Sequence, residues 1–144
     1  MRFLLIFVFL LLPFWSWEQV DIEGSWWGVV TQNEGGFRSE YQFEIYFIQK
    51  GNKLEGRSYV YFDNAYAQME LQGFFLDKNT VLFQEIKVVD FTVLDGLEWC
   101  IKRGQLKLNT AKETWELNGD WAGATSFGPC IPGKVHLKKV KPRA

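Results

Sequence analysis

Two carboxylates in the middle of the chain, Glu70 and Glu85, are the first candidates for acid–base chemistry or for ligand binding. Glu85 lies in the stretch LFQEIKVVD, where alternation puts it on the same face as Val81, Phe83 and Val89. Glu70, in AQMELQG, alternates with apolar neighbours and so falls on the opposite, polar face. A glycosidase needs two carboxylates that face one cleft, and this pattern supplies only one that faces inward.

Glu85 itself leaves two interpretations open. As an inward carboxylate it could bind a hydroxyl group or a cation. Alternatively, it lies on the outer face and pairs with Lys87, two positions along the chain. We favour the second interpretation, because charged groups are rarely buried without a partner.

Other catalytic patterns are missing from the sequence. His136 is the only histidine and lies in the basic stretch KVHLKKV, which is more typical of a surface or rim residue than of a catalyst. There is no Gly-x-Ser-x-Gly, no phosphate-binding loop, no His-Glu-x-x-His and no Cys-x-x-Cys. We therefore expect no enzyme, no metal site and no cofactor.

Aromatic side chains are the chemical groups that the chain has in abundance, with 13 Phe, 7 Trp and 5 Tyr. Flat rings stack on sugars and on apolar small molecules. Several rings lie beside the turn at residues 63–64, and two more flank the cysteines. The candidate ligand-binding residues are Val60, Tyr61, Glu85, Trp99 and Phe127.

The chain opens with one Arg and a nearly unbroken apolar run, MRFLLIFVFLLLPFW. This pattern is typical of a secretory signal peptide, and it is short for a membrane anchor, which needs about 20 apolar residues. We predict a signal peptide over residues 1–19, with cleavage between Ser16 and Asp21. A single domain then spans residues 20–144 of a secreted or periplasmic protein that does not span the membrane.

The net charge bears on the class of partner, and the cysteine content bears on the presence of a disulfide. The 16 basic and 17 acidic side chains nearly balance, which argues against a nucleic-acid partner because that needs a broad basic face. Export would expose the two cysteines, Cys100 and Cys130, to an oxidising compartment, so we predict a disulfide between them. The alternative is a pair of buried free thiols.

The elements that must position these residues are strands. In EYQFEIYFIQ, alternation puts Tyr41, Phe43, Ile45 and Phe47 on one face. About eight such segments follow one another, mostly across short turns, which predicts antiparallel neighbours. Closing the sheet removes its two edges, so we predict an all-β fold, an eight-stranded antiparallel up-and-down barrel. An open sandwich is the competing architecture, and charges inside the strands argue against an outer-membrane barrel.

One phrase occurs twice, as IEGSWWG near the front and ELNGDWAG near the end. In a closed barrel the first strand meets the last, so we expect the two phrases to be near neighbours. Glycine inside a strand allows sharp coiling or the close approach of another chain, and the tryptophan beside it could plug a barrel end. The residues assigned these structural roles are Gly24, Trp26, Gly119 and Trp121.

Gly24-Ser25-Trp26 resembles the Gly-x-Trp of the calycin superfamily, which includes the lipocalins and the avidins. The resemblance implies a ligand-holding barrel in which a basic residue of the last strand packs across the tryptophan. The candidates for that basic residue are Lys134, Lys138 and Lys139. The Leu-x-Gly strands at Gly56 and Gly73 and the ending KKVKP are similar to the avidin branch, whose members often form homo-oligomers.

The chain departs from the avidins where they bind biotin. Avidins carry an Asn after the aromatic pair of the first strand, and this chain has Gly28 there. The Tyr and Ser that follow the glycine of their third strand would fall on Ser58 and Val60. The polar set for the ureido ring is therefore missing, and we expect a ligand other than biotin.

These observations predict an exported, soluble binding protein that holds a small apolar or sugar-like ligand in the barrel mouth. A bridge between Cys100 and Cys130 would pull Trp99 and Phe127 together at one barrel end, as a ligand gate. The competing interpretation is an aromatic plug at the barrel base. The alternative function is an accessory subunit with a filled barrel that binds a protein partner in an extracytoplasmic assembly.

Overall fold

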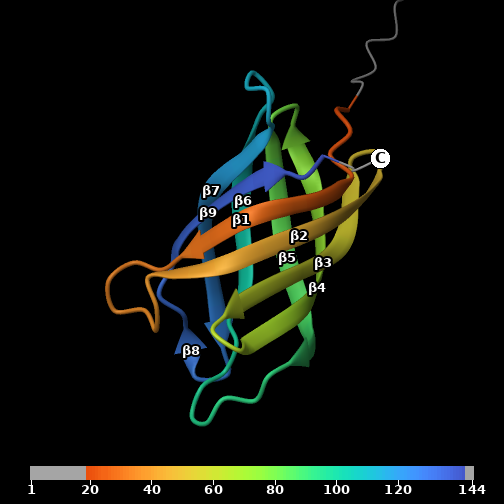
Figure 1. Ribbon diagram of the computed structural model, residues 1–144. Coiled ribbons are helices and arrows are strands. Elements are labelled where there is room, and N and C mark those ends of the chain that lie inside the picture. The colour runs from red at the N-terminus through yellow and green to blue at the C-terminus, as the bar shows by residue number, and fades with distance from the viewer. Residues whose placement is uncertain (1–18, 142–144) are drawn as a thin grey trace, which may run out of the picture.

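The computed structural model describes residues 19–141, which form a closed antiparallel barrel (Figure 1). Apart from Gln19, the predicted signal peptide falls outside the described residues. The strands are β1 (Gly24–Thr31), β2 (Glu40–Lys50), β3 (Lys53–Phe62), β4 (Ala65–Asp77), β5 (Thr80–Phe91), β6 (Ile101–Asn109), β7 (Glu116–Thr125), β8 (Gly128–Pro129) and β9 (Gly133–Lys139). Because β8 pairs only with the end of β7, eight strands make the barrel.

The order of the strands closes the sheet on itself. From β1 to β7 each strand pairs with the next in sequence, and β9 pairs with both β7 and β1. This confirms the predicted all-β, eight-stranded up-and-down barrel. No helix in the described part of the chain is long and apolar enough to cross a bilayer.

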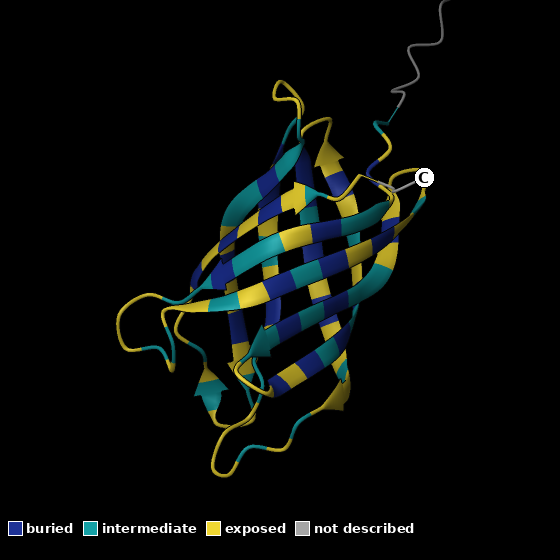
Figure 2. Cartoon of the chain, in the orientation of Figure 1, coloured by how far each residue is buried: buried dark blue, intermediate teal, exposed yellow. Residues whose placement is uncertain are grey.

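The alternation of side chains gives the barrel a filled interior. On β2, Phe43, Ile45 and Phe47 are buried, whereas Gln42 before them and Tyr46 between them are exposed. Figure 2 shows the same alternation of buried and exposed residues along most strands, with exposed residues dominating the loops. The predicted inner face of this strand is therefore confirmed, although Tyr41 at its start is only partly buried.

Trp26 closes one end of the barrel. It is fully buried, and its Nε1 donates to the carbonyl oxygen of Ile22 at 2.8 Å, in the segment that leads into β1. The ammonium group of Lys139 lies 5.6 Å from the centre of the Trp26 ring. Of the three lysines that the resemblance nominated, Lys139 is thus the one that packs across the tryptophan.

The second Gly-x-Trp phrase lies on β7, and β9 separates it from β1. Trp26 pairs with Lys139 at one end of β9, whereas Trp121 pairs with Gly133 at the other, a separation of about 20 Å along a strand. The two phrases are therefore not near neighbours, as we had expected, and their tryptophans serve opposite ends of the interior. Gly119 allows β7 to lie close to β6, since a Cβ there would lie 1.9 Å from the Gln105 carbonyl oxygen.

The end opposite Trp26 carries the longer loops, at the bottom of Figure 1. These are the segment 92–100 between β5 and β6 and the segment around β8. Cys100 and Cys130 form the predicted disulfide between them, with their Cα atoms 6.3 Å apart. The bridge therefore ties the entrance of β6 to the entrance of β9.

β5 and β6 separate before the middle of β5 and close to the start of β6. Their ladder ends at the pair Gln84–Arg103. Register irregularities against β4 insert extra residues into the second half of β5, and such bulges bend a strand away from its neighbour. They also break the alternation, so Val89, expected on the inner face, is 44% exposed.

Candidate functional site

An apolar pocket opens at the end of the barrel opposite Trp26. Its wall is built from β1, β2, β3, β6 and β7 and from the loop between β5 and β6. The lining residues are Val30, Gln32, Phe37, Tyr41, Val60, Phe62, Leu94, Leu97, Glu98, Trp99, Cys100, Lys102 and Trp121. We call this cavity, of about 90 Å³, the mouth pocket.

Most polar groups of the wall are already paired within the protein. Trp121 Nε1 donates to the Thr31 carbonyl oxygen at 2.7 Å, and Trp99 Nε1 donates to that of Thr92 at 2.9 Å. The Tyr41 hydroxyl donates to Gln32 Oε1 at 2.6 Å. Burial raises the pKa of Tyr41 above its usual range, so the phenol is neutral at physiological pH.

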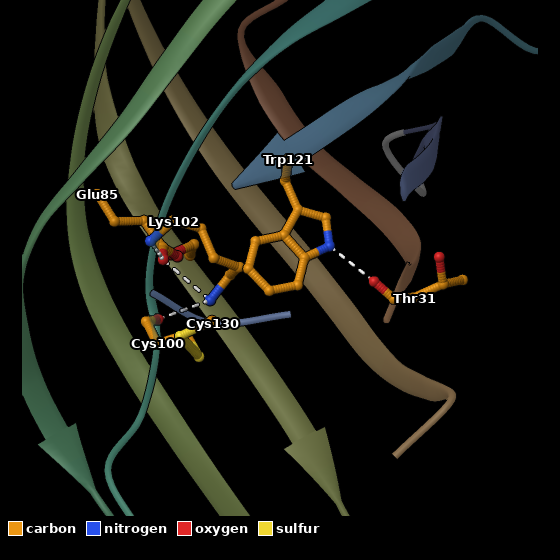
Figure 3. A network of polar contacts seen from close by, with 7 residues as sticks. Thr31, Glu85, Cys100, Lys102, Trp121 and Cys130 are labelled. Atoms are coloured by element: carbon orange, nitrogen blue, oxygen red, sulfur yellow. Dashed lines mark hydrogen bonds and ion pairs between the residues drawn. A yellow bond between two sulfur atoms is a disulfide. The ribbon is translucent and has the colours of Figure 1, made fainter. Parts of the chain in front are cut away.

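Lys102 is the one ammonium group in the pocket wall, and only 4% of its side chain is exposed. Its Nζ lies 2.9 Å from Glu85 Oε1 and donates to the Cys100 carbonyl oxygen at 3.2 Å (Figure 3). The same Nζ lies 5.5 Å from the centre of the Phe43 ring. A positive charge is therefore held against apolar side chains, with a carboxylate behind it.

Glu85 lies behind Lys102 and contacts both its backbone and its side chain. Its Oε1 accepts from the Lys102 backbone N–H at 2.7 Å, and its Oε2 accepts from the Ser58 hydroxyl. Ser58 and Glu85 are both almost fully buried. The carboxylate takes the position that the next ladder hydrogen bond would occupy if β5 and β6 stayed paired beyond Gln84–Arg103.

The outer-face interpretation of Glu85 is therefore wrong. Glu85 points inward and pairs with Lys102, whereas Lys87 pairs with Glu70 at 3.6 Å on the outside. The rule that buried charges need partners still holds. The partner of Glu85 is Lys102 on the neighbouring strand β6. The residues next to Glu85 in sequence therefore do not reveal it.

The loop between β5 and β6 covers part of the pocket. Trp99 packs on Phe62, with ring centres 5.4 Å apart. Glu98 accepts from the backbone N–H of Ser126 at 2.7 Å and from its hydroxyl. These hydrogen bonds hold the pKa of Glu98 below its usual range and, like the disulfide, they join this loop to the segment after β7.

The structure brings only some of the predicted ligand-binding residues together. Val60 and Trp99 line the mouth pocket, and Glu85 lies behind it, bonded to Lys102. Tyr61 points outward on β3, where its ring stacks on Tyr59. Phe127 lies at the tip of the β7–β8 turn, 82% exposed and outside the lining of the pocket.

The two rings predicted to form the gate, Trp99 and Phe127, are therefore not brought together. The disulfide is present, but the ring that Trp99 contacts is Phe62 and not Phe127. Lys102 is the main residue that the sequence analysis missed. Alternation in IKRGQLKL does place Lys102 on the same face as Leu106 and Leu108, and this was the available signal.

Among residues 19–141, no group of three or more His, Cys, Asp or Glu side chains is arranged to hold a metal ion. The chain matches no protein-family model, no curated protein and no solved structure. The assignment of a function therefore rests on the sequence and the geometry of the chain itself.

Proposed function

We propose that this chain is an exported, soluble, non-enzymatic binding protein that holds a small, largely apolar ligand in the mouth pocket. One observation carries the proposal: an apolar pocket with the buried ammonium group of Lys102 in its wall. Ligand sites are typically apolar cavities in which a few polar groups set the orientation. The mouths of β-barrels are among the places where such sites occur.

Lys102 defines what the inner end of the ligand should be. An ammonium group has three N–H donors, and two of those of Lys102 are engaged, one by Glu85 and one by the Cys100 carbonyl oxygen. The remaining donor is free to bind an acceptor such as a carbonyl or a carboxylate. Because Glu85 neutralises the ammonium charge, a neutral acceptor suffices.

The size of the pocket limits what it can enclose. An engineered cavity of about 150 Å³ holds one benzene molecule, and the mouth pocket is smaller, at about 90 Å³. It would therefore bury a short chain or the edge of one ring. The rest of the ligand would lie among Phe37, Phe62 and Trp99 at the rim.

Export and kinship with the calycins belong to the same proposal. The apolar leader and the disulfide between Cys100 and Cys130 support an oxidising, extracytoplasmic location. The closed eight-stranded barrel, Gly24-Ser25-Trp26 and the lysine across that tryptophan support a calycin-like origin.

Native mass spectrometry of the protein exported by its own host tests the proposal. We expect an added mass of a few hundred daltons that is released on denaturation. Val60→Trp, which would fill the pocket, should abolish the added mass, whereas the outward-facing Tyr61→Ala should keep it. The bare mass alone, or a bound molecule that Val60→Trp does not displace, would contradict ligand binding in this pocket.

A second function, binding of a protein partner, is favoured by a different observation. Exposed apolar side chains gather where β5 leaves β6, at Ile86, Val89, Phe91, Val93, Leu97 and Ile101. Clusters of this kind mark interaction sites. If Val89→Lys and Phe91→Lys release a partner that co-purifies from the host, the accessory-subunit function gains support.

A further inference from the structure

The outer surface of the barrel carries a second concentration of aromatic side chains, on β1 and β3. Trp27 on β1 is 59% exposed. The register pairs Trp27 with Glu44 on β2, and Glu44 with Tyr59 on β3. Tyr61 lies two residues further along β3, its ring nearly parallel to that of Tyr59 at 8° and 6.4 Å between centres.

These rings border a groove over β2, which we call the outer groove. It is lined by Trp27, Gly28, Gln42, Phe43, Glu44 and Tyr61. Trp27 and Tyr61 come from the two strands that flank β2, and the outward side chains Gln42 and Glu44 rise between them. Strands two apart in a sheet are separated by about 9.6 Å, and Tyr61 is displaced from Trp27 by two residues, about 7 Å, along the strand. The backbones that carry the two rings are therefore about 12 Å apart, which leaves room for one sugar ring between the side chains.

The electrostatics of the outer groove favour a hydrogen-bonding ligand. Partial burial raises the pKa of Glu44 above its usual range, and the neighbouring Trp27 side chain opposes part of that shift. A carboxylate that has lost part of its hydration gains more from a hydroxyl donor than a fully hydrated one does. Gln42 adds an amide that both donates and accepts.

We propose that the outer groove binds a ring of a neutral oligosaccharide, with Trp27 and Tyr61 stacking on the sugar and with Glu44 and Gln42 bonding its hydroxyl groups. Sugars present apolar C–H faces and polar hydroxyl edges, which match aromatic walls and a polar floor. A purely apolar ligand would leave Glu44 desolvated and unpaired. A carboxylated or sulfated sugar would be repelled by the Glu44 carboxylate.

Stacking between Tyr59 and Tyr61 reduces the cost of binding. Each ring restrains its neighbour before the ligand arrives, so less side-chain freedom is lost on association. The site is also independent of the mouth pocket, because Tyr61 and Gln42 face outward on strands whose inward residues include Val60 and Phe43. Either site can therefore bind while the other does not.

Titration of the intact protein with cellotetraose, chitotetraose and mannotetraose, followed by tryptophan fluorescence and calorimetry, tests this proposal. We expect at least one of these neutral probes to bind, and polygalacturonate not to compete. Trp27→Ala and Tyr61→Ala should each weaken the binding at least tenfold, and Glu44→Gln should weaken it several-fold. Because Trp27 is exposed, its variant should unfold at nearly the wild-type temperature.

Phe127→Ala is the matched control, since it removes an even more exposed ring far along the chain from the outer groove. Its affinity for the probe should equal that of the wild type. No binding of any neutral tetrasaccharide at millimolar concentration would overturn the proposal, as would binding that survives Trp27→Ala. A concentration-dependent dimer that Trp27→Ala dissociates in sedimentation velocity would instead identify the groove as an interface between copies of the chain.

Discussion

At the scale of single residues, the buried pair of Glu85 and Lys102 dominates the interior. Both side chains are almost completely buried, and each contacts a backbone group as well as its partner. Such pairs contribute little net stability compared with apolar residues of similar volume, but removing one member leaves an uncompensated charge. The pair therefore affects the free energy of unfolding mainly when one of its two members is removed.

This argument predicts the behaviour of two variants. Lys102→Met should lower the free energy of unfolding by about 3–5 kcal/mol, because Glu85 is left buried without its counter-ion. Glu85→Gln combined with Lys102→Met should recover most of that loss, since the amide oxygen can still accept from the backbone N–H of residue 102. Urea unfolding of the three proteins measures the difference, and equal losses in both variants would refute the argument.

The same two variants separate stability from ligand binding. If Lys102 anchors the ligand, the double variant should fold nearly as well as the wild type and still lose any mass that co-purifies with the protein from its host. Full retention of that mass in the double variant would show that the pair is purely structural. Val60→Trp then distinguishes a pocket that never binds from one that binds without Lys102.

At the scale of elements, the loop between β5 and β6 is held by contacts of different kinds. Trp99 packs on Phe62, Glu98 accepts from Ser126, and Cys100 is bonded to Cys130. The Glu98 contact is the one that pH controls. Its carboxyl pKa is lowered in the folded protein from the ordinary value of 4.5, chiefly by the Ser126 hydroxyl and then by the Ser126 backbone N–H.

A lowered carboxyl pKa gives a stability contribution that is complete above pH 4.5 and is lost as pH falls through the folded-state value. We therefore expect Glu98→Gln to be less stable than the wild type at pH 6, with the difference shrinking as the pH falls below 4.5. Asp77 and Glu116 also have lowered pKa values, but both proteins contain them, so they cancel in the comparison. A difference in urea midpoint that is as large at pH 3 as at pH 6 would show that the Glu98 charge is not responsible.

The strands also show how much of the fold could be predicted from the sequence. Alternation identified all eight barrel strands, because each is long enough to bury one face. It failed in the second half of β5, where bulges shift Val89 outward. Alternation also could not predict the pair of Glu85 and Lys102. That contact depends on the point at which β6 separates from β5, and the sequence of a single strand does not indicate that point.

The mouth was the least predictable part for a related reason. Phe127 was expected at the gate because it lies close to a bridged cysteine in sequence. In a tight turn, however, the tip residue points away from the chains that the bridge joins, and Phe127 is 82% exposed. Tyr61 was named as a candidate ligand-binding residue of the barrel mouth on its aromatic character, although alternation with the buried Val60 puts it on the outer face.

At the scale of the whole molecule, the disulfide links the two loops of the mouth, which the barrel ladder leaves uncovered. Cys100 and Cys130 are 30 residues apart in sequence. Closing a loop of that length lowers the entropy of the unfolded chain, which raises the free energy of unfolding by about 3–4 kcal/mol. The barrel itself does not depend on the bridge, because β6, β7 and β9 stay paired through their own ladders. Reduction should therefore lower stability without unfolding the protein at neutral pH.

Cys100→Ser combined with Cys130→Ser tests this division between barrel and mouth. We expect a loss of about 3–4 kcal/mol in urea unfolding, a far-ultraviolet spectrum that still reports a β-barrel, and weaker retention of the ligand in the mouth pocket. Tetrasaccharide binding in the outer groove should not change, because β1, β2 and β3 carry that site and none of them contains a bridged cysteine. If the double serine variant lost both kinds of binding together, the barrel and the mouth would be one cooperative unit, and the independence inferred for the two sites would be wrong.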